Sequence, residues 1–495
     1  MKTSNCLNSS LVQIAILLTV NLNTFAQIQL GLDIDGEAAG DNSGNSVSMP
    51  DINTVAIGAF GNDGNGNGSG HVRVYIWNGS AWVQKGADIN GQAADNLCGK
   101  SVSMPDANTV AIGSHNNNGN GFHSGHARVF TWNGSAWIQK GGDIEGEAAG
   151  DESGTCVSMP DANTVAIGAP MNAGNGTQAG HARIYAWNGV TWLQKGTDID
   201  GEAPGDLSGI SVDMPDANTV AIGAHSNDGN GSLAGHVRIF SWNGSSWIQK
   251  GTDIDGEAAG DYSGTSVSMP NSNMVAIGAP INAGNGSQAG QVRIFSWNGG
   301  SWIQQGIDID GEAAGDRSGI SVSMADSVSL AIGAFHNNGN GAQSGQVRIY
   351  SWNGSAWMQI GADIDGEAAN DLSGFSVSMP SANVVAIGAI GNDGSGADAG
   401  HVRVYSQFSV SIHENDFENK MVVYPSPASG DLTLDLGSTY TRIDIIVRNI
   451  IGKEIKRNSF TRAGKLQLSL PGEAGIYLIE INADNRKARL KAVKE

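Results

Sequence analysis

The chain has 495 residues, a net charge of −21 and 71 glycines. Residues 27–408 carry 37 acidic against 13 basic side chains. An acidic surface of this size repels phosphate groups, which argues against a nucleic-acid partner. Abundant glycine without a collagen period is typical of many tight turns between short strands, so the composition predicts an all-β protein and not a disordered chain.

Residues 1–26 have the pattern of a secretory signal peptide. Lys2 supplies the positive start, residues 11–20 are mostly apolar, and Ala26 ends a small-residue cleavage site. This apolar stretch is too short to cross a bilayer, and no later stretch is longer. We therefore expect an exported protein with no transmembrane segment once the peptide has been removed.

A 55-residue unit follows the signal peptide and occurs seven times. The segment from Asp33 to Asp41 returns with its first residue at positions 33, 88, 143, 198, 253, 308 and 363, with no insertion between copies. A period of this size with several short β-runs per unit is typical of a β-propeller, in which each unit forms one blade. Cys98 and Cys156 stand where most copies have Ser, and the pattern leaves open whether they pair.

Each unit contains four short strand patterns. In the first unit they cover residues 46–49, 54–59, 71–77 and a run from residue 82 toward residue 89. A Pro-Asp turn, a Gly/Asn-rich loop and an Asn-Gly hairpin connect them in that order. Trp77 and Trp82 flank the hairpin, and six units repeat this pair, so we interpret these tryptophans as structural and not as a sugar platform.

The seventh unit predicts how the ring closes. It ends at Tyr405 without the hairpin and the fourth strand, and the missing piece lies at the other end of the mature chain, where residues 28–35 match residues 138–145. An N-terminal strand that completes the last blade removes an open sheet edge. The predicted fold is therefore all-β, with a seven-bladed propeller over residues 27–408 that is closed by the N-terminal strand and followed by a small β-sandwich over residues 409–495.

The unit resembles the FG-GAP repeat of integrin-type propellers. The resemblance rests on Ser153-Gly154, residues 157–159 and residues 165–170, and it covers about residues 27–406. The family often carries a calcium loop with several carboxylates between its first two strands. Here that connection is residues 160–164, with Asp161 as its single carboxylate. The resemblance therefore implies the fold, and the calcium site of the family is not carried over.

Strand order places the long loops on one face of the predicted propeller. The loops between the second and third strands and the linkers between blades lie together there, and they hold nearly all loop carboxylates. One hypothesis is that Asp35, Glu37 and Asp41 bind calcium, because they offer hard oxygen ligands at close spacing. The second unit weakens it, since Asn and Gln stand in place of acidic residues there.

Two other hypotheses for these loops stay open. The Gly/Asn-rich loops can bind a ligand, with Asp63, Asp228 and Asp393 as candidates because side chains vary at this position. Alternatively, Asp and Gly only build the turns. No cofactor is predicted beyond the calcium hypothesis.

Seven near-identical units offer little of the asymmetry that an active site needs, so we predict that the propeller is not an enzyme. His115, His123 and His126 gather around one loop of the second unit, either as a metal site or as polar loop residues. A histidine begins the third strand in five units, and we interpret it as structural.

The composition changes near residue 408, where glycine falls and Lys and Arg rise. Strand patterns at residues 421–424, 431–436, 442–448, 465–470 and 475–481 predict a small β-sandwich. This region resembles the type A sorting domain of the bacterial type IX secretion system. The matching residues are Tyr424, Pro425, Pro427, Gly452, Lys453, Gly475, Tyr477, Lys491 and Lys494. The resemblance implies transport across the outer membrane by the type IX machinery, followed by display on the cell surface or release from it.

The sequence therefore predicts a secreted or surface-attached propeller that binds an extracellular glycan, matrix or protein ligand. Two alternatives stay open: an extracellular enzyme that degrades a polymer, and a structural protein of the surface layer.

Overall fold

The computed structural model describes residues 26–408, 421–424, 431–449, 453–470, 475–484 and 486–494. The chain divides into two compact units, Ala26–Phe408 and a second one that includes Ser409–Glu495. The predicted signal peptide lies outside the described residues, apart from Ala26. None of the described segments forms a helix long and apolar enough to cross a membrane.

The first unit consists of seven similar sheets, and the sheet of the first repeat shows how each is built. It contains β3 (Ser46–Asp51), β4 (Thr54–Ala59), β5 (His71–Trp77), β6 (Trp82–Gln84) and β7 (Ile89–Asn90). The strands β3 to β6 pair in sequence order, and β7 pairs with β5. β4 is buried along its whole length, as expected for a strand covered on both faces by neighbouring blades.

The other blades repeat this order. Blade 2 holds β8 (Ser101–Asp106), β9 (Thr109–Ser114), β10 (His126–Trp132), β11 (Trp137–Gln139) and β12 (Ile144–Glu145). Blade 3 holds β13 (Cys156–Asp161), β14 (Thr164–Ala169), β15 (His181–Trp187), β16 (Trp192–Gln194) and β17 (Ile199–Asp200). Blade 4 holds β18 (Ser211–Asp216), β19 (Thr219–Ala224), β20 (His236–Trp242), β21 (Trp247–Gln249) and β22 (Ile254–Asp255). Blade 5 holds β23 (Ser266–Asn271), β24 (Met274–Ala279), β25 (Gln291–Trp297), β26 (Trp302–Gln304) and β27 (Ile309–Asp310). Blade 6 holds β28 (Ser321–Asp326), β29 (Ser329–Ala334), β30 (Gln346–Trp352), β31 (Trp357–Gln359) and β32 (Ile364–Asp365).

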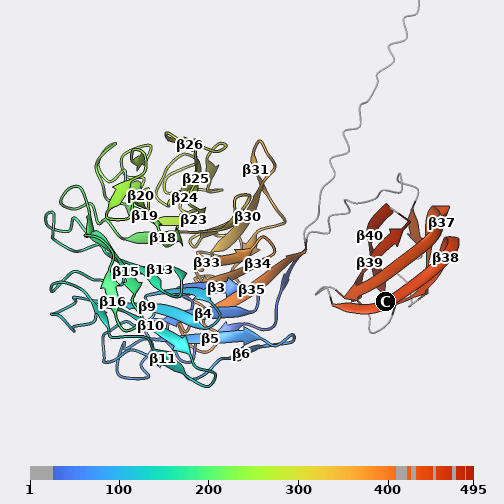
Figure 1. Cartoon of the computed structure of the whole chain (residues 1–495), viewed down its shortest axis with the longest axis horizontal. Helices are drawn as coiled ribbons and strands as arrows, with labels where there is room; N and C mark the ends of the chain where they lie inside the picture. Colours follow the sequence, from blue (N-terminus) through green and yellow to red (C-terminus); the bar gives the residue numbers. More distant parts are fainter. Residues whose placement is uncertain are drawn as a thin grey trace, which may run out of the picture. The chain divides into compact units, whose positions relative to one another are not determined.

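The seventh blade is completed by the N-terminal strand, which confirms the predicted closure. It holds β33 (Ser373–Ser381), β34 (Val384–Ala389) and β35 (His401–Phe408), together with β1 (Ala26–Gln29) and β2 (Ile34–Asp35). β1 pairs antiparallel with β35, from Ala26 opposite Phe408 to Gln29 opposite Tyr405. In Figure 1 the orange strands β33 to β35 lie beside the blue strands β3 and β4, so the last blade meets the first.

The first strand of every blade lies innermost, and a belt of hydrogen bonds joins these inner strands around the ring. The amide of Met104 donates to the hydroxyl of Ser48 in the preceding blade over 2.9 Å. Equivalent bonds begin at Met49, Met159, Met214, Met269, Met324 and Met379. Six of the acceptors are serines, and the seventh is Asp213. The blades also approach closely, since a Cβ atom at Gly58 would collide with the carbonyl oxygen of Gly99 in the next blade.

The predicted fourth strand is broken in two, as β6 and β7. Gly86 stands in the break with a φ of 82°, and a Cβ atom there would lie 2.6 Å from the ring of Trp132. The break therefore makes room for a tryptophan of the next blade. Trp82 in turn donates from Nε1 to the carbonyl oxygen of Leu30 over 2.8 Å, so the tryptophan pairs join neighbouring blades.

The described residues of the second unit form five strands of a small β-sandwich. These are β36 (Val422–Tyr424), β37 (Asp431–Asn449), β38 (Glu454–Ser469), β39 (Gly475–Ala483) and β40 (Arg486–Lys494). The order is β36-β37-β39-β40, with β38 on β37, and the pairing of β37 with β38 shifts register between Asp435 and Tyr440. The two halves of β37 contribute Leu434 and Ile445 to one apolar core.

Candidate functional site

The long loops gather on one face of the propeller, where the first strand of each blade begins and the second ends. We call this the loop face. It carries the linkers between blades and the loops between the second and third strands, such as residues 60–70. Asn65 ties the two together, because its Nδ2 atom donates to the carbonyl oxygen of Gly91 over 2.7 Å. The same bond is made by Asn120, Asn175, Asn230, Asn285 and Asn340.

The predicted ligand-binding residues lie on three separate loops of this face. Asp63 accepts a 2.8 Å hydrogen bond from the amide of Gly68, and Asp228 and Asp393 accept the same bond from the residue five positions on. Asn118 and Asn338 accept it in two other blades. One carboxylate oxygen of each Asp therefore shapes its own loop.

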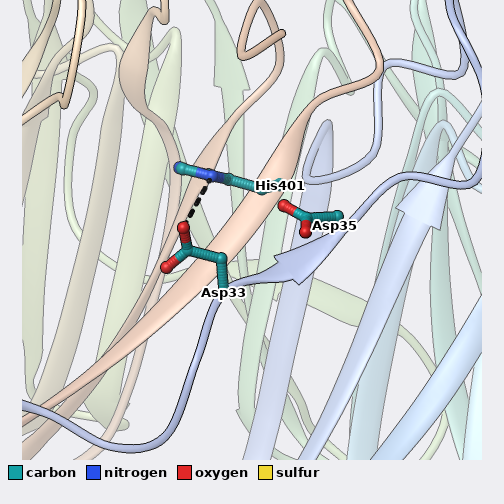
Figure 2. A group of neighbouring side chains, drawn as sticks. All are labelled: Asp33, Asp35 and His401. Atoms are coloured by element: carbon teal, nitrogen blue, oxygen red, sulfur yellow. Dashed lines mark ion pairs between the residues drawn. The ribbon is translucent and has the colours of Figure 1, made fainter. Parts of the chain in front are cut away.

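The structure does not bring Asp35, Glu37 and Asp41 together around one point. Asp41 is buried and accepts hydrogen bonds from the amides of Glu37 and Ala38 and from Asn62, so it holds the turn of the linker. Asp35 instead lies with Asp33 beside His401, as Figure 2 shows.

Glu37 belongs to a different cluster, in blade 1. It lies with His71 and Asp88, and its Oε2 atom is 3.7 Å from Nδ1 of that histidine. The predicted trio is thus divided between the two blades that its linker joins.

The central channel opens into a cavity of about 400 Å³. Its lining includes the residue at position 45 and its equivalents, at the outer end of each inner strand: Asn45, Lys100, Thr155, Ile210, Thr265, Ile320 and Phe375. His225 lines it as well. A cavity of this size is within the range of small-ligand pockets, about 300 to 1,000 Å³.

The residues at this opening differ from blade to blade, although the inner strands beside them are nearly identical. Two positions of the linker vary between the repeats. One is position 45 with its equivalents, and the other is position 42 with its equivalents. The latter are Asn42, Leu97, Glu152, Leu207, Tyr262, Arg317 and Leu372. The residue after the second strand varies too: Phe60, His115, Pro170, His225, Pro280, Phe335 and Ile390. By contrast, Gly44, Val47 and Met49 have the same residue in all seven repeats. We call the three varying sets the mouth residues.

Mouth residues contact one another across blade boundaries. The Lys100 ammonium lies 5.6 Å from the ring centroid of Phe60, and the rings of His225 and Tyr262 meet edge-on at 5.4 Å. Burial lowers the pKa of His225 to about 4, so its imidazole is neutral at pH 7. The mouth thus presents apolar, aromatic, charged and neutral polar groups.

The backbone at the mouth is held in an unfavourable conformation. All seven residues at position 42 and its equivalents have φ between 52° and 56°, in the left-handed region. This region costs non-glycine residues about 1–2 kcal/mol, with Asn the best tolerated. Only Asn42 suits it, whereas Leu207, Tyr262 and Arg317 do not. Strain of this kind concentrates at functional sites.

Sequence reasoning missed the mouth residues because it followed the positions that repeat. The signal was present in the positions that do not repeat, when the seven units are placed in register. It became meaningful only when the structure showed that position 45 and its equivalents line one cavity and that residues of the other two sets contact them or each other beside it.

Cys98 is buried and Cys156 is half-buried, and both are free thiols. The sulfur of Cys98 accepts a hydrogen bond from the Arg128 guanidinium over 3.3 Å. The structure thus shows no disulfide between them.

The sorting-motif residues lie in the second unit. Tyr477 is buried in its core, and Tyr424 is 45% exposed at the end of β36. Lys494 donates to the carbonyl oxygen of Leu470 over 3.0 Å. Gly475 begins β39, Lys491 lies on β40 and Lys453 is exposed before β38. Pro425, Pro427 and Gly452 lie outside the described residues.

The fold and the C-terminal region define a seven-bladed β-propeller with a separate export domain. Residues 422–495 match the family described as the secretion system C-terminal sorting domain, which confirms the predicted sorting region. The protein is therefore exported by the type IX route to the cell surface or beyond it.

Solved structures with a similar chain course include a protease domain and a xyloglucanase. The β-propeller domain of the Trilobed protease from Pyrococcus furiosus is 10% identical, and the match covers 69% of this chain and 90% of that chain, with a TM-score of 0.38. The GH74 xyloglucanase from Xanthomonas campestris is 13% identical, and the match covers 94% of this chain and 75% of that chain, with a TM-score of 0.42. No curated protein matches the sequence.

Proposed function

We propose that the propeller is a non-catalytic binding module of the bacterial surface, which takes an extracellular glycan or protein ligand at the mouth of its central channel. The observation that carries this proposal is the variation of the mouth residues beside inner strands that repeat almost unchanged. A propeller that only needed to fold would gain nothing from four or five different side chains at each set of equivalent positions.

Strain at the mouth supports the same proposal. Asn or Gly at position 42 and its equivalents would relieve the left-handed backbone, yet Leu, Tyr, Arg and Glu occupy it. Side chains retained at a cost to stability are expected where they contact a ligand. The loop face also fits this role, since loops held by a rigid scaffold are the usual place for binding.

The relation to FG-GAP propellers is part of this proposal. It is supported by the Ser-Gly segment, which six of the seven repeats have, by the Val-Ala-Ile-Gly-Ala segment, which five have, and by the seven-bladed ring. Adhesion to a glycan or matrix protein is the activity that this relation favours.

The test is a binding screen of the full mature chain against a glycan array and a panel of matrix proteins, with calcium and with chelator. Tyr262→Asn introduces at the mouth the residue that blade 1 already has. Ser245→Gly is the control on the opposite face, where blade 5 has Gly300. We expect the screen to identify a ligand whose affinity is at least tenfold lower for Y262N than for the wild type. Its affinity for S245G should equal that of the wild type. Equal affinity of both variants for the ligand would mean that the binding site lies elsewhere. Cleavage of a polymer by the wild type would contradict the non-catalytic role.

A further inference from the structure

A buried histidine next to carboxylates recurs in five of the seven blades. It is the first residue of the third strand in each: His71, His126, His181, His236 and His401. Their residue exposures are at most 1%. Each belongs to a group of at least three side chains whose possible ligand atoms lie within 4.8 Å of one another.

Blade 3 shows the full arrangement. Nδ1 of His181 is 3.9 Å from Glu147 of the linker that enters the blade, and 3.8 Å and 4.0 Å from Asp198 and Asp200 of the linker that leaves it. Figure 2 shows the equivalent group in blade 7, where the His401 ring from β35 faces Asp33 and Asp35, and Asp33 is 3.7 Å away.

These separations are too long for hydrogen bonds, whose donor and acceptor lie about 2.7 to 3.2 Å apart. Both ring nitrogens of His71, His126, His181 and His401 are buried without a hydrogen-bond partner in the described structure. An unpaired buried polar atom costs about 1–3 kcal/mol, and here the cost recurs from blade to blade. The arrangement therefore calls for a group that contacts the imidazole and the carboxylates together.

Blades 5 and 6 provide an internal comparison, because Gln replaces the histidine there. Gln291 donates directly to Glu257 over 2.9 Å, and Gln346 donates to Glu312 over 3.0 Å. Gln thus forms a hydrogen bond with the Glu of the linker that enters its blade. In blades 1, 3, 4 and 7 the equivalent Glu oxygen lies 3.7 to 4.0 Å from Nδ1 of the histidine, too far for a hydrogen bond. The histidine blades and the glutamine blades are built for different contacts at one position.

We propose that each of the five histidine blades binds one divalent transition-metal ion between the imidazole and the carboxylates on the loop face. Metal bonds of 2.0 to 2.2 Å place two ligand atoms about 3 to 4 Å apart, which is the spacing seen here. Imidazole with carboxylates suits zinc and its neighbours, whereas calcium prefers oxygen ligands alone.

The local charge also favours a cation. In blade 3 the carboxylates of Glu147, Asp198 and Asp200 surround the imidazole, and the guanidinium of Arg183 lies 3.5 Å from the second oxygen of Glu147. Two net negative charges remain, which one divalent ion neutralises. Blades 4 and 7 have the same set, whereas blade 1 has Asn90 and blade 2 has Gln92 in place of one carboxylate. We therefore expect the tightest sites in blades 3, 4 and 7.

Entry to the site is open from the surface. The side chain of Glu147 is 43% exposed and that of Asp198 is 29% exposed, above a histidine that is 1% exposed. A bound ion would connect the linkers that enter and leave the blade to its third strand, and so stabilise the loop face. This inference does not depend on the ligand proposed for the mouth.

The test measures the zinc content of the full mature chain. The protein is stripped with EDTA, dialysed against micromolar zinc chloride and analysed by elemental mass spectrometry. We expect about five zinc ions per chain, one fewer in His181→Gln and one more in Gln291→His, which recreates the set of blade 4 around Glu257, Asp308 and Asp310. His123→Asn, in a loop outside the five groups, is the control and should leave the content unchanged.

A zinc content that is the same in the wild type, H181Q and Q291H would overturn the inference. Should H181Q fail to fold, the gain in Q291H decides, since it adds a ligand and removes none. A parallel dialysis against calcium separates the two chemistries. Calcium bound in the same amount, and unaffected by either variant, would show that carboxylates bind without the imidazole and would also overturn it.

Discussion

The amide of Met49 donates a 2.9 Å hydrogen bond to the hydroxyl of Ser378, which follows it by 329 residues in the chain. This bond joins the first blade to the seventh and is the last member of the belt between inner strands. It repeats the bond between Met104 and Ser48, also 2.9 Å, within the continuous part of the chain. The junction where the ring closes is thus built like the junction between blades 1 and 2.

We expect Ser378→Ala to lower the free energy of unfolding by about 1–3 kcal/mol, because the amide of Met49 would lose its acceptor. Ser48→Ala is the matched variant at a junction that is not the closure. Urea denaturation of both should give similar losses. A loss in S48A with none in S378A would mean that the ring is open in solution.

Asp213 is the single carboxylate in the belt, at a position where the other six blades have Ser. Burial raises the pKa of the Asp213 carboxyl in the folded protein. The stability that the protonated carboxyl contributes is therefore fully present below the pKa of Asp in the unfolded chain, and it is lost as the pH rises through the pKa of the folded state. We therefore expect Asp213→Ser to raise the free energy of unfolding at pH 7 by roughly 1 kcal/mol, which corresponds to a rise in Tm of about 2 °C.

The gain in D213S should shrink toward pH 4, where Asp213 of the wild type becomes protonated. Thermal denaturation at pH 4 and pH 7 measures both. An equal Tm difference at the two pH values would show that the effect comes from packing and not from the charge.

The architecture was predictable because it depends on positions that repeat. The spacing of Asp33 and its copies set the number of blades, and the match of residues 28–35 to residues 138–145 set the closure. The break between β6 and β7 was not predictable, since it arises from the ring of Trp132 packing against Gly86 in another blade. The site residues were harder still, because Asp35 and Glu37 are neighbours in sequence but face histidines of different blades.

His225 at the mouth should make stability depend on pH. Burial lowers its pKa to about 4, below the value of about 6.5 for an unfolded chain. The unfolded state therefore binds the proton more readily, and the stability contributed by neutral His225 is full above pH 6.5 and is lost as the pH falls toward 4. His225→Phe, the residue at this position in blades 1 and 6, is expected to remove about 1 kcal/mol of the loss between pH 7 and pH 5.5. Urea denaturation at the two pH values measures this, and an identical loss in both proteins would contradict it.

Strain at the mouth can be measured by exchanging two equivalent residues. Glu152 has a φ of 54°, and burial also raises its pKa, so both its backbone and its charge oppose folding at pH 7. We expect Glu152→Asn to raise the free energy of unfolding by about 1 kcal/mol. Asn42→Glu, the reverse exchange in blade 1, should lower it by a similar amount. Changes of the same sign in both variants would rule out backbone strain as the cause.

Export should depend on the sorting domain. Deletion of residues 409–495 is expected to leave the propeller in the periplasm, because the type IX machinery would lack the region it recognises. Immunoblots of cell fractions, with a periplasmic marker, would detect it. Surface display of the truncated chain would contradict this role.

Two tyrosines distinguish recognition of the sorting domain from its folding. Tyr477 is 6% exposed within the core, so Tyr477→Ala is expected to destabilise the domain by about 3–5 kcal/mol and to block export by unfolding it. Tyr424 is 45% exposed and begins the sorting motif, so Tyr424→Ala should leave the domain folded. Loss of export in Y424A, with an unchanged circular dichroism spectrum, would show that the machinery contacts this end of β36. Normal export of Y424A together with failure of Y477A would mean that the machinery requires the folded domain and reads it elsewhere, for example along the basic strand β40.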